Sequence, residues 1–178
     1  MYSKFDQLAK VLLSACSEYL GRDNMWLTDI AQNGNSILRV INYPPLDTNS
    51  NTNSIRAAAH EDINLITILC ESTSGGLELK THDGTWLPIA KTDGALIVDS
   101  GDMLQNITNG IFKSTTHRVV NPKDPSHQRF SMPFFSHPRP ECSLTPPRDL
   151  IEKTGGVQKY SSTTAGEYLS QRLEEIGF

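Results

Sequence analysis

The sequence has few cysteines, few aromatic residues and no long apolar run. It contains three cysteines in 178 residues, and Cys16, Cys70 and Cys142 are far apart. An odd number of scattered cysteines excludes a disulfide scaffold and makes a reducing compartment, the cytoplasm, the expected location. The mean hydropathy is −0.37, and no segment approaches the ~20 apolar residues of a membrane-spanning helix. The chain opens without a basic, apolar leader, so secretion is not expected.

The sequence also has no excess of positive charge. Sixteen basic residues stand against twenty acidic ones, which gives a net charge of −4. Nucleic acids are bound largely by neutralising phosphates with Lys and Arg, so no nucleic-acid partner is expected. Internal repeats, heptads and low-complexity tracts are missing as well. The length and a hydrophobic content of 37% are typical of one globular domain with a buried core.

Apolar residues recur at intervals of three and four at both ends of the chain. Near the N-terminus this spacing predicts an amphipathic helix that ends at Gly21. Its expected packing face consists of Phe5, Leu8, Ala9, Leu12, Cys16 and Tyr19. Near the C-terminus, Thr164 and Glu167 have the spacing of a capping box. The short helix that follows should end at Gly177 and pack through Leu169, Leu173 and Ile176.

Short β-rich runs occupy the middle of the chain. They cover residues 37–41, 65–70, 77–79, 95–98, 111–120 and 129–135. The intervening turn signals are Asp83-Gly84, Asp93-Gly94 and Asn109-Gly110. Many short strands predict an all-β sandwich or barrel, with a polar loop at 47–54. After residue 135, four prolines predict an extended tail that crosses the surface.

Three residues are candidates for a metal site. His60 and Asp62 are two positions apart at the start of an apolar run, and such residues point to the same side of an extended chain. His117 comes much later in a β-rich run, where a barrel could bring it opposite the pair. Two imidazoles and one carboxylate leave open positions on a metal, which suits non-haem Fe(II). Isolated His-x-Asp pairs are common, so on spacing alone the alternative is a surface histidine beside a solvated acid.

Arg129 and Ser131 form a second pair with the period of a strand, and Phe130 lies between them on the other side. A guanidinium binds a carboxylate with two parallel hydrogen bonds, so this pair predicts a carboxylate site inside a barrel. A surface ion pair is the alternative for the motif taken alone. The other histidines, at 82, 127 and 137, are expected to be solvated or structural, and Trp86 and Phe130 to be core residues.

These residues belong to a longer ordered series. It runs through His60-Glu61-Asp62, Leu65-Ile66-Thr67, Gly75-Gly76-Leu77, Gly101-Asp102-Met103-Leu104-Gln105, Thr108-Asn109-Gly110, His117-Arg118-Val119 and Arg129-x-Ser131-x-Pro133-Phe134-Phe135. The series resembles the catalytic part of the isopenicillin N synthase-like branch of the Fe(II)/2-oxoglutarate-dependent oxygenases. The resemblance extends from the first helix to the last residue.

The resemblance implies a mainly β fold, a double-stranded β-helix or jelly roll, with an N-terminal helix and a short C-terminal helix. One catalytic domain is expected over residues 1–178. Its parts would be a leading helix in 1–30, the jelly-roll core in 36–135, and a tail with the terminal helix in 136–178. The family's usual N-terminal region is expected to be absent.

The resemblance also implies the roles of the site residues. The expected ligands of Fe(II) are His60, Asp62 and His117. The co-substrate 2-oxoglutarate would be held through its distal carboxylate by Arg129 and Ser131, and Tyr43 matches a tyrosine near a carboxylate in relatives. O₂ completes the expected set of cofactors and co-substrates.

The implied function is an oxygenase that hydroxylates or desaturates a small molecule while 2-oxoglutarate is decarboxylated to succinate. One alternative is an oxidase of the isopenicillin N synthase type, in which Arg129 and Ser131 bind the carboxylate of the substrate itself. Another is an inactive remnant that acts as an interaction module. Because a barrel without its usual cover exposes apolar surface, a homodimer is expected.

Overall fold

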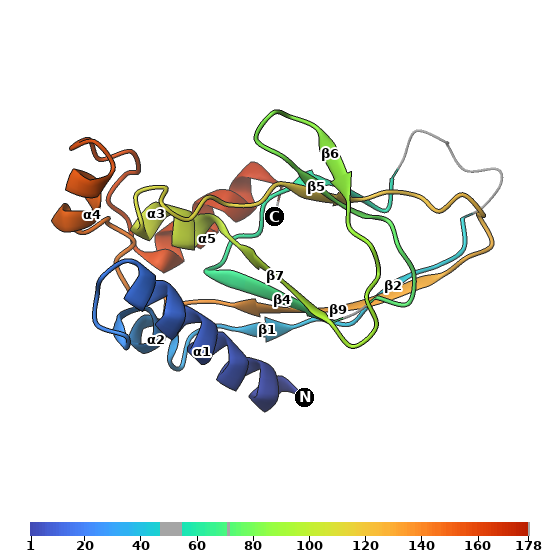
Figure 1. Cartoon of the computed structure of the whole chain (residues 1–178), viewed down its shortest axis with the longest axis horizontal. Coiled ribbons are helices and arrows are strands. Elements are labelled where there is room, and N and C mark those ends of the chain that lie inside the picture. The colour runs from blue at the N-terminus through green and yellow to red at the C-terminus, as the bar shows by residue number, and fades with distance from the viewer. Residues whose placement is uncertain (47–54, 71, 178) are drawn as a thin grey trace.

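The computed structural model describes residues 1–46, 55–70 and 72–177, and it shows two antiparallel sheets with helices grouped at one end (Figure 1). The strands are β1 (Ile37–Leu38), β2 (Ile41–Tyr43), β3 (Ala57–His60), β4 (Ile66–Cys70), β5 (Leu77–Lys80), β6 (Trp86–Pro88), β7 (Leu96–Ser100), β8 (His117–Val119) and β9 (Arg129–Ser136). The helices are α1 (Tyr2–Tyr19), α2 (Trp26–Ala31), α3 (Asp102–Ile107), α4 (Arg148–Lys153) and α5 (Ala165–Glu175). The predicted mainly β fold with a helix near each end is confirmed.

The strand order is that of two interleaved sheets. The larger sheet runs β1-β9-β4-β7, with β2 also paired to β9, and the smaller runs β3-β8-β5-β6. Each sheet combines strands from distant parts of the sequence. Directly opposite residues of an antiparallel pair share one face of the sheet, so the registers decide which side chains line the space between the sheets.

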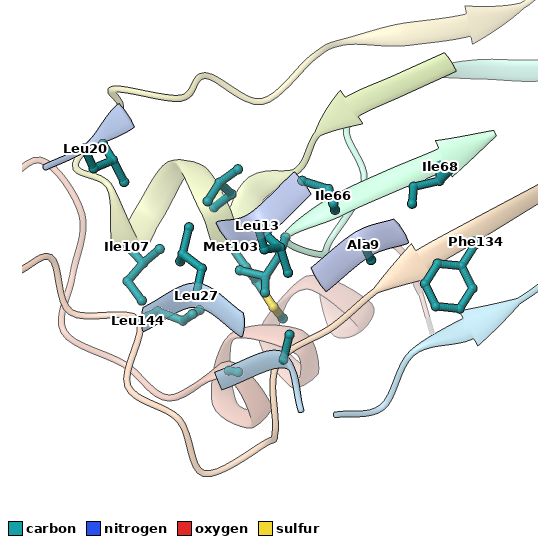
Figure 2. Packing of buried hydrophobic residues seen from close by; sticks show 14 of the residues in the cluster. Ala9, Leu13, Leu20, Leu27, Ile66, Ile68, Met103, Ile107, Phe134 and Leu144 are labelled. Atoms are coloured by element: carbon teal, nitrogen blue, oxygen red, sulfur yellow. The ribbon is translucent and has the colours of Figure 1, made fainter. Parts of the chain in front are cut away.

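The hydrophobic core lies on the outer face of the larger sheet, beneath α1. Ile68 of β4 is opposite Val98 of β7 and Phe134 of β9. The Phe5 ring of α1 stacks on Phe134 with a centroid distance of 5.7 Å. Figure 2 shows Ala9 and Leu13 of α1 beside the strands that carry Ile66, Ile68 and Phe134. The core therefore does not occupy the inner face of this sheet, which points toward the smaller sheet.

The first helix is confirmed, and its packing face agrees with the predicted one except at Tyr19, since Leu8, Leu12 and Cys16 are partly buried against the core. The buried positions are Phe5, Ala9, Leu13 and Ser17. Tyr19 is 76% exposed. The hydroxyl of Ser17 accepts the N–H of Leu27 at 3.2 Å, which binds α1 to α2. The sequence did not predict α2, and Ser17 is buried where α2 packs against α1.

The predicted strand at 111–120 is wrong in its first part. Only His117–Val119 is a strand, and α3 lies upstream of it. Asn109 and Gly110 have φ angles of 52° and 82°, the left-handed conformation that ends a helix. The N–H of Ser114 donates to the side chain of Gln105 at 3.0 Å, so this backbone is held by α3 instead of a sheet. The predicted loop at 47–54 lies outside the described residues.

The proline-rich segment after residue 135 is not the extended surface tail that was predicted. Leu144 and Leu150 are fully buried at 0% exposure. Helix α4 begins directly after Pro147, because the fixed φ of proline suits the start of a helix. The predicted capping box is confirmed: Thr164 Oγ1 accepts the N–H of Glu167, and the Glu167 carboxylate accepts the N–H of Thr164.

Two phenylalanines of β9 test where the core lies. Phe134→Ala should lower the free energy of unfolding by ~3–5 kcal/mol, because the ring is fully buried under α1. Phe130 was predicted in the core but is 39% exposed, so Phe130→Ala should cost less than ~1 kcal/mol. Urea unfolding followed by circular dichroism measures both values. Equal losses for the two variants would contradict this placement of the core.

Candidate metal centre

His60 and His117 lie side by side on adjacent strands of the smaller sheet. They are directly paired in the register of β3 and β8, and their ring centroids are 4.3 Å apart. The Nδ1 of His60 lies 2.7 Å from the carbonyl of Ala58, and the Nδ1 of His117 lies 3.0 Å from that of Thr115. A hydrogen on each Nδ1 can donate a hydrogen bond to the facing carbonyl, and in this tautomer the Nε2 lone pair is free to bind a metal.

Asp62 directs its carboxylate between these two imidazoles. Its Oδ1 lies 3.7 Å from the Nε2 of His60 and 3.8 Å from the Nε2 of His117. Its Oδ2 accepts a hydrogen bond from the hydroxyl of Thr67 at 2.5 Å, and that hydroxyl accepts one from the amide of Asn64 at 2.8 Å. The side chain of Asp62 is only 9% exposed. One carboxylate oxygen is therefore held by the protein, and the other points at the histidines.

The geometry and donor chemistry of this trio fit a divalent transition metal. Ligand atoms that share one ion at bond lengths of ~2.1 Å lie within ~4.2 Å of each other, and the two separations from Asp62 Oδ1, 3.7 and 3.8 Å, meet this limit. All three ligand atoms lie within 4.8 Å of one another. In the described part of the chain, no other group of three His, Cys, Asp or Glu meets this criterion.

Asp99 is a neighbour of the trio that sequence reasoning missed. It is opposite Thr67 in the register of β4 and β7, and its Oδ2 lies 3.7 Å from the Nδ1 of His117. Burial, together with the negative charge of Asp62, raises the pKa of Asp99 to about 7. The available signal was a single acid directly after three apolar residues in the strand Leu96–Ser100.

Arg129 and Ser131 lie on the inner face of β9, as the period of two predicted. Arg129 is 1% exposed and Ser131 6%. Tyr43 is opposite Arg129 in the register of β2 and β9, and the guanidinium carbon lies 5.2 Å from the centre of its ring. The Nε of Arg129 donates to the carbonyl of Ser74 at 3.3 Å. Burial lowers the pKa of Arg129, and no acid of the described residues forms an ion pair with it.

A second arginine, Arg56, lies on the same tyrosine and was also missed. Its guanidinium carbon is 5.9 Å from the centre of the Tyr43 ring, and it donates to the carbonyl of His127 at 2.5 Å. In the sequence, Arg56 only follows the predicted polar loop at 47–54 and belongs to no recognised motif, so no site role was predicted for it. The inner space thus has two acids near the histidines and two arginines around Tyr43.

The remaining histidines lie outside the trio. His82 is exposed, and the side chain of His127 is 66% exposed beside Asp124. His137 is buried at 9% exposure, its Nδ1 lies 3.3 Å from the carbonyl of Phe135, and burial lowers its pKa. These positions agree with the predicted solvated or structural roles.

The chain matches known proteins along nearly all of its length. The profile of the 2OG-Fe(II) oxygenase superfamily matches residues 34–138. The chain is 31% identical to a 2-oxoglutarate-Fe(II) type oxidoreductase of Metarhizium rileyi, over 97% of this chain and 50% of that protein. It is 29% identical to a proline hydroxylase of Petromyces alliaceus, over 97% of this chain and 56% of that protein.

Solved structures agree with these sequence matches. A protein of Caulobacter crescentus assigned to the 2OG-Fe(II) oxygenase family superposes with a TM-score of 0.87 at 38% identity, over 98% of this chain and 57% of that one. A full-length Neurospora crassa protein, solved in complex with alpha-KG and thymine, superposes with a TM-score of 0.89 at 26% identity, over 98% of this chain and 54% of that one.

The matches settle the family. The chain spans about half the length of the curated relatives it matches. Within that span, the fold, the profile match and the two imidazoles beside a carboxylate agree with one another. The resemblance inferred from the ordered motifs is thus confirmed, and the chain belongs to the 2OG-Fe(II) oxygenase superfamily.

Proposed function

We propose that this protein is an Fe(II)- and 2-oxoglutarate-dependent oxygenase that hydroxylates or desaturates a small molecule. The observation that carries the proposal is the convergence of His60, Asp62 and His117 in a chain of this superfamily. In a hydroxylation, the substrate C–H group, O₂ and 2-oxoglutarate give the alcohol, succinate and CO₂. One oxygen atom enters the product and the other enters succinate.

The trio supplies the metal ligands in this proposal. His60 and His117 would bind Fe(II) through Nε2, because each Nδ1 faces a backbone carbonyl. Asp62 would bind through Oδ1, because Thr67 engages Oδ2. Bound Fe(II) supplies the redox chemistry of O₂ activation, and the protein positions the reacting groups and excludes water.

Arg129 supplies the carboxylate-binding group, with Ser131 and Tyr43 beside it. A buried guanidinium without a carboxylate partner is costly, and an incoming carboxylate removes that cost. The Nη1 atom of Arg129 is buried and has no hydrogen-bond partner among the described residues. The distal carboxylate of 2-oxoglutarate has the charge and the planar shape that this group binds best.

The proposed substrate is a small molecule. Proline and thymine, the compounds named with two of the relatives, are both small molecules. A net charge of −4 gives no electrostatic basis for binding nucleic acid.

No helix in the described part of the chain is long and apolar enough to cross a membrane. The three cysteines are free thiols, which supports the proposed cytoplasmic location.

We also propose that residues 1–178 act as one catalytic domain, with the parts 1–30, 36–135 and 136–178. The packing supports this division. Phe5 of the leading helix stacks on Phe134 of β9, and Tyr168 of the terminal helix packs against the same hydrophobic cluster. Both flanking segments therefore share one core with the sheets.

The metal assignment predicts a selective loss of binding. Asp62→Ala removes the anionic ligand and should weaken Fe(II) binding by more than the ~10–100-fold that is typical of residues behind the ligands. His82→Ala should bind Fe(II) as the wild type does, since His82 is exposed and outside the trio. Anaerobic Fe(II) titration measures both. Equal iron stoichiometry in the wild type and the His60→Ala/His117→Ala variant would overturn the assignment.

The co-substrate assignment predicts a separate effect at Arg129. Arg129→Lys keeps the charge and loses the planar fork, so 2-oxoglutarate should bind about tenfold more weakly while Fe(II) binding is unchanged. Arg118→Lys is the matched control, because Arg118 pairs with Glu78 and stacks on Trp86. Calorimetry measures the affinities. Unchanged affinity in Arg129→Lys, or substrate oxidation without succinate release, would favour the oxidase alternative.

Self-association is the remaining proposal, and the edge of the larger sheet offers apolar surface for it. Leu96 and Val98 of the edge strand β7 are 44% and 43% exposed. A homodimer formed there should make the thermal midpoint rise with protein concentration. Val98→Lys should reduce the dimer fraction in sedimentation velocity. A wild type that is monomeric over a wide concentration range would contradict the proposal.

A further inference from the structure

The start of α3 holds the backbone of the loop that carries Asp62. The N–H groups of Gly101, Asp102 and Met103 donate to the carbonyls of Leu65, Asp62 and Asn64 at 3.0, 2.9 and 3.0 Å. A Cβ on Gly101 would lie 2.6 Å from the carbonyl oxygen of Asp62, so only glycine permits this approach. The first turn of α3 and residues 62–65 therefore move as one unit.

The side chain of Asp102 joins this unit to α5. Asp102 is 2% exposed, and its Oδ2 accepts a hydrogen bond from the hydroxyl of Tyr168 at 3.1 Å. The Nε of Arg172 forms an ion pair with the same oxygen at 3.4 Å. Tyr168 and Arg172 are four residues apart and thus on one face of α5. In Figure 1, α5 lies close to α3.

Docking of α5 is separable from the stability of α5 itself. The helix has its own capping box at Thr164 and Glu167, and Arg172 also pairs with Glu175 on the surface. Neither of these interactions includes Asp102. The residue whose carboxylate anchors α5 also donates its backbone N–H to the carbonyl of Asp62. Asp102 makes both contacts, one through its N–H and one through its carboxylate.

We propose that Asp102 is a positioning residue for the metal centre and that α5, bound to it through Tyr168 and Arg172, fixes the loop that presents Asp62. The inference rests on the proposed function, because it concerns the same trio. When α5 is released from Asp102, the first turn of α3 loosens, and Asp62 is held less firmly between the imidazoles. Residues behind metal ligands commonly change metal affinity without touching the metal.

The test compares variants that weaken α5 in two different ways. Tyr168→Phe removes the hydrogen bond to Asp102, and the Tyr168→Phe/Arg172→Met double variant removes the ion pair as well. The controls are Thr164→Ala, which removes the helix cap, and Glu175→Gln, which removes the surface ion pair. Mn²⁺ affinity is measured by electron paramagnetic resonance, and stability by the urea midpoint. We expect the double variant to bind Mn²⁺ about tenfold more weakly, Tyr168→Phe to be intermediate, and both controls to bind as the wild type does.

The outcomes separate this inference from the proposed function. If the double variant binds Mn²⁺ with wild-type affinity, the positioning role of Asp102 is overturned. The same holds if Thr164→Ala, at a similar urea midpoint, weakens Mn²⁺ binding as much as the double variant does. If the double variant does not fold, Tyr168→Phe takes its place in the comparison with Thr164→Ala. The inference is then overturned if Tyr168→Phe binds Mn²⁺ no more weakly than Thr164→Ala does. If the wild type binds no Mn²⁺, the proposed metal site and this inference both fail.

Discussion

The carboxylate of Asp62 is buried between two sheets, and a buried carboxylate is stable only where hydrogen-bond donors or a cation compensate its charge. Thr67 of the larger sheet donates to one of its oxygens, and the imidazoles of His60 and His117 approach the other from the smaller sheet. The same carboxylate therefore contacts both layers of the fold. The distance between the sheets and the shape of the metal trio are fixed together.

Charges of opposite sign are kept apart in the inner space instead of being paired. Asp62 and Asp99 lie beside the histidines, whereas Arg129 and Arg56 lie around Tyr43. No ion pair among the described residues joins the two sets. A cation at the first position and an anion at the second would each meet a complementary field, which matches a metal ion and a carboxylate held side by side.

The polar interior is possible because the apolar core lies elsewhere. The large apolar residues of β4 and β9, such as Ile68 and Phe134, face outward and pack beneath α1. Alternation along the same strands turns Thr67, Arg129 and Ser131 inward. Burial of the outer face therefore stabilises the larger sheet, whose inner face carries the polar side chains. This packing offsets the free-energy cost of burying charged groups on the inner face.

Local pattern determined much of this protein from the sequence alone. Alternation in β9 placed Arg129 and Ser131 on one side, the spacing of Thr164 and Glu167 gave the cap of α5, and the ordered motifs identified the family. The first two features depend on neighbours a few positions apart, and the motifs are short runs that occur in a fixed order, so the sequence contains all three directly. Only the tertiary structure decided that Asp99 lies near His117, that Arg56 shares Tyr43 with Arg129, and that α5 reaches Asp102. Each of these contacts joins residues from separate elements, and strand register and helix docking, which no local spacing encodes, set the distances between them.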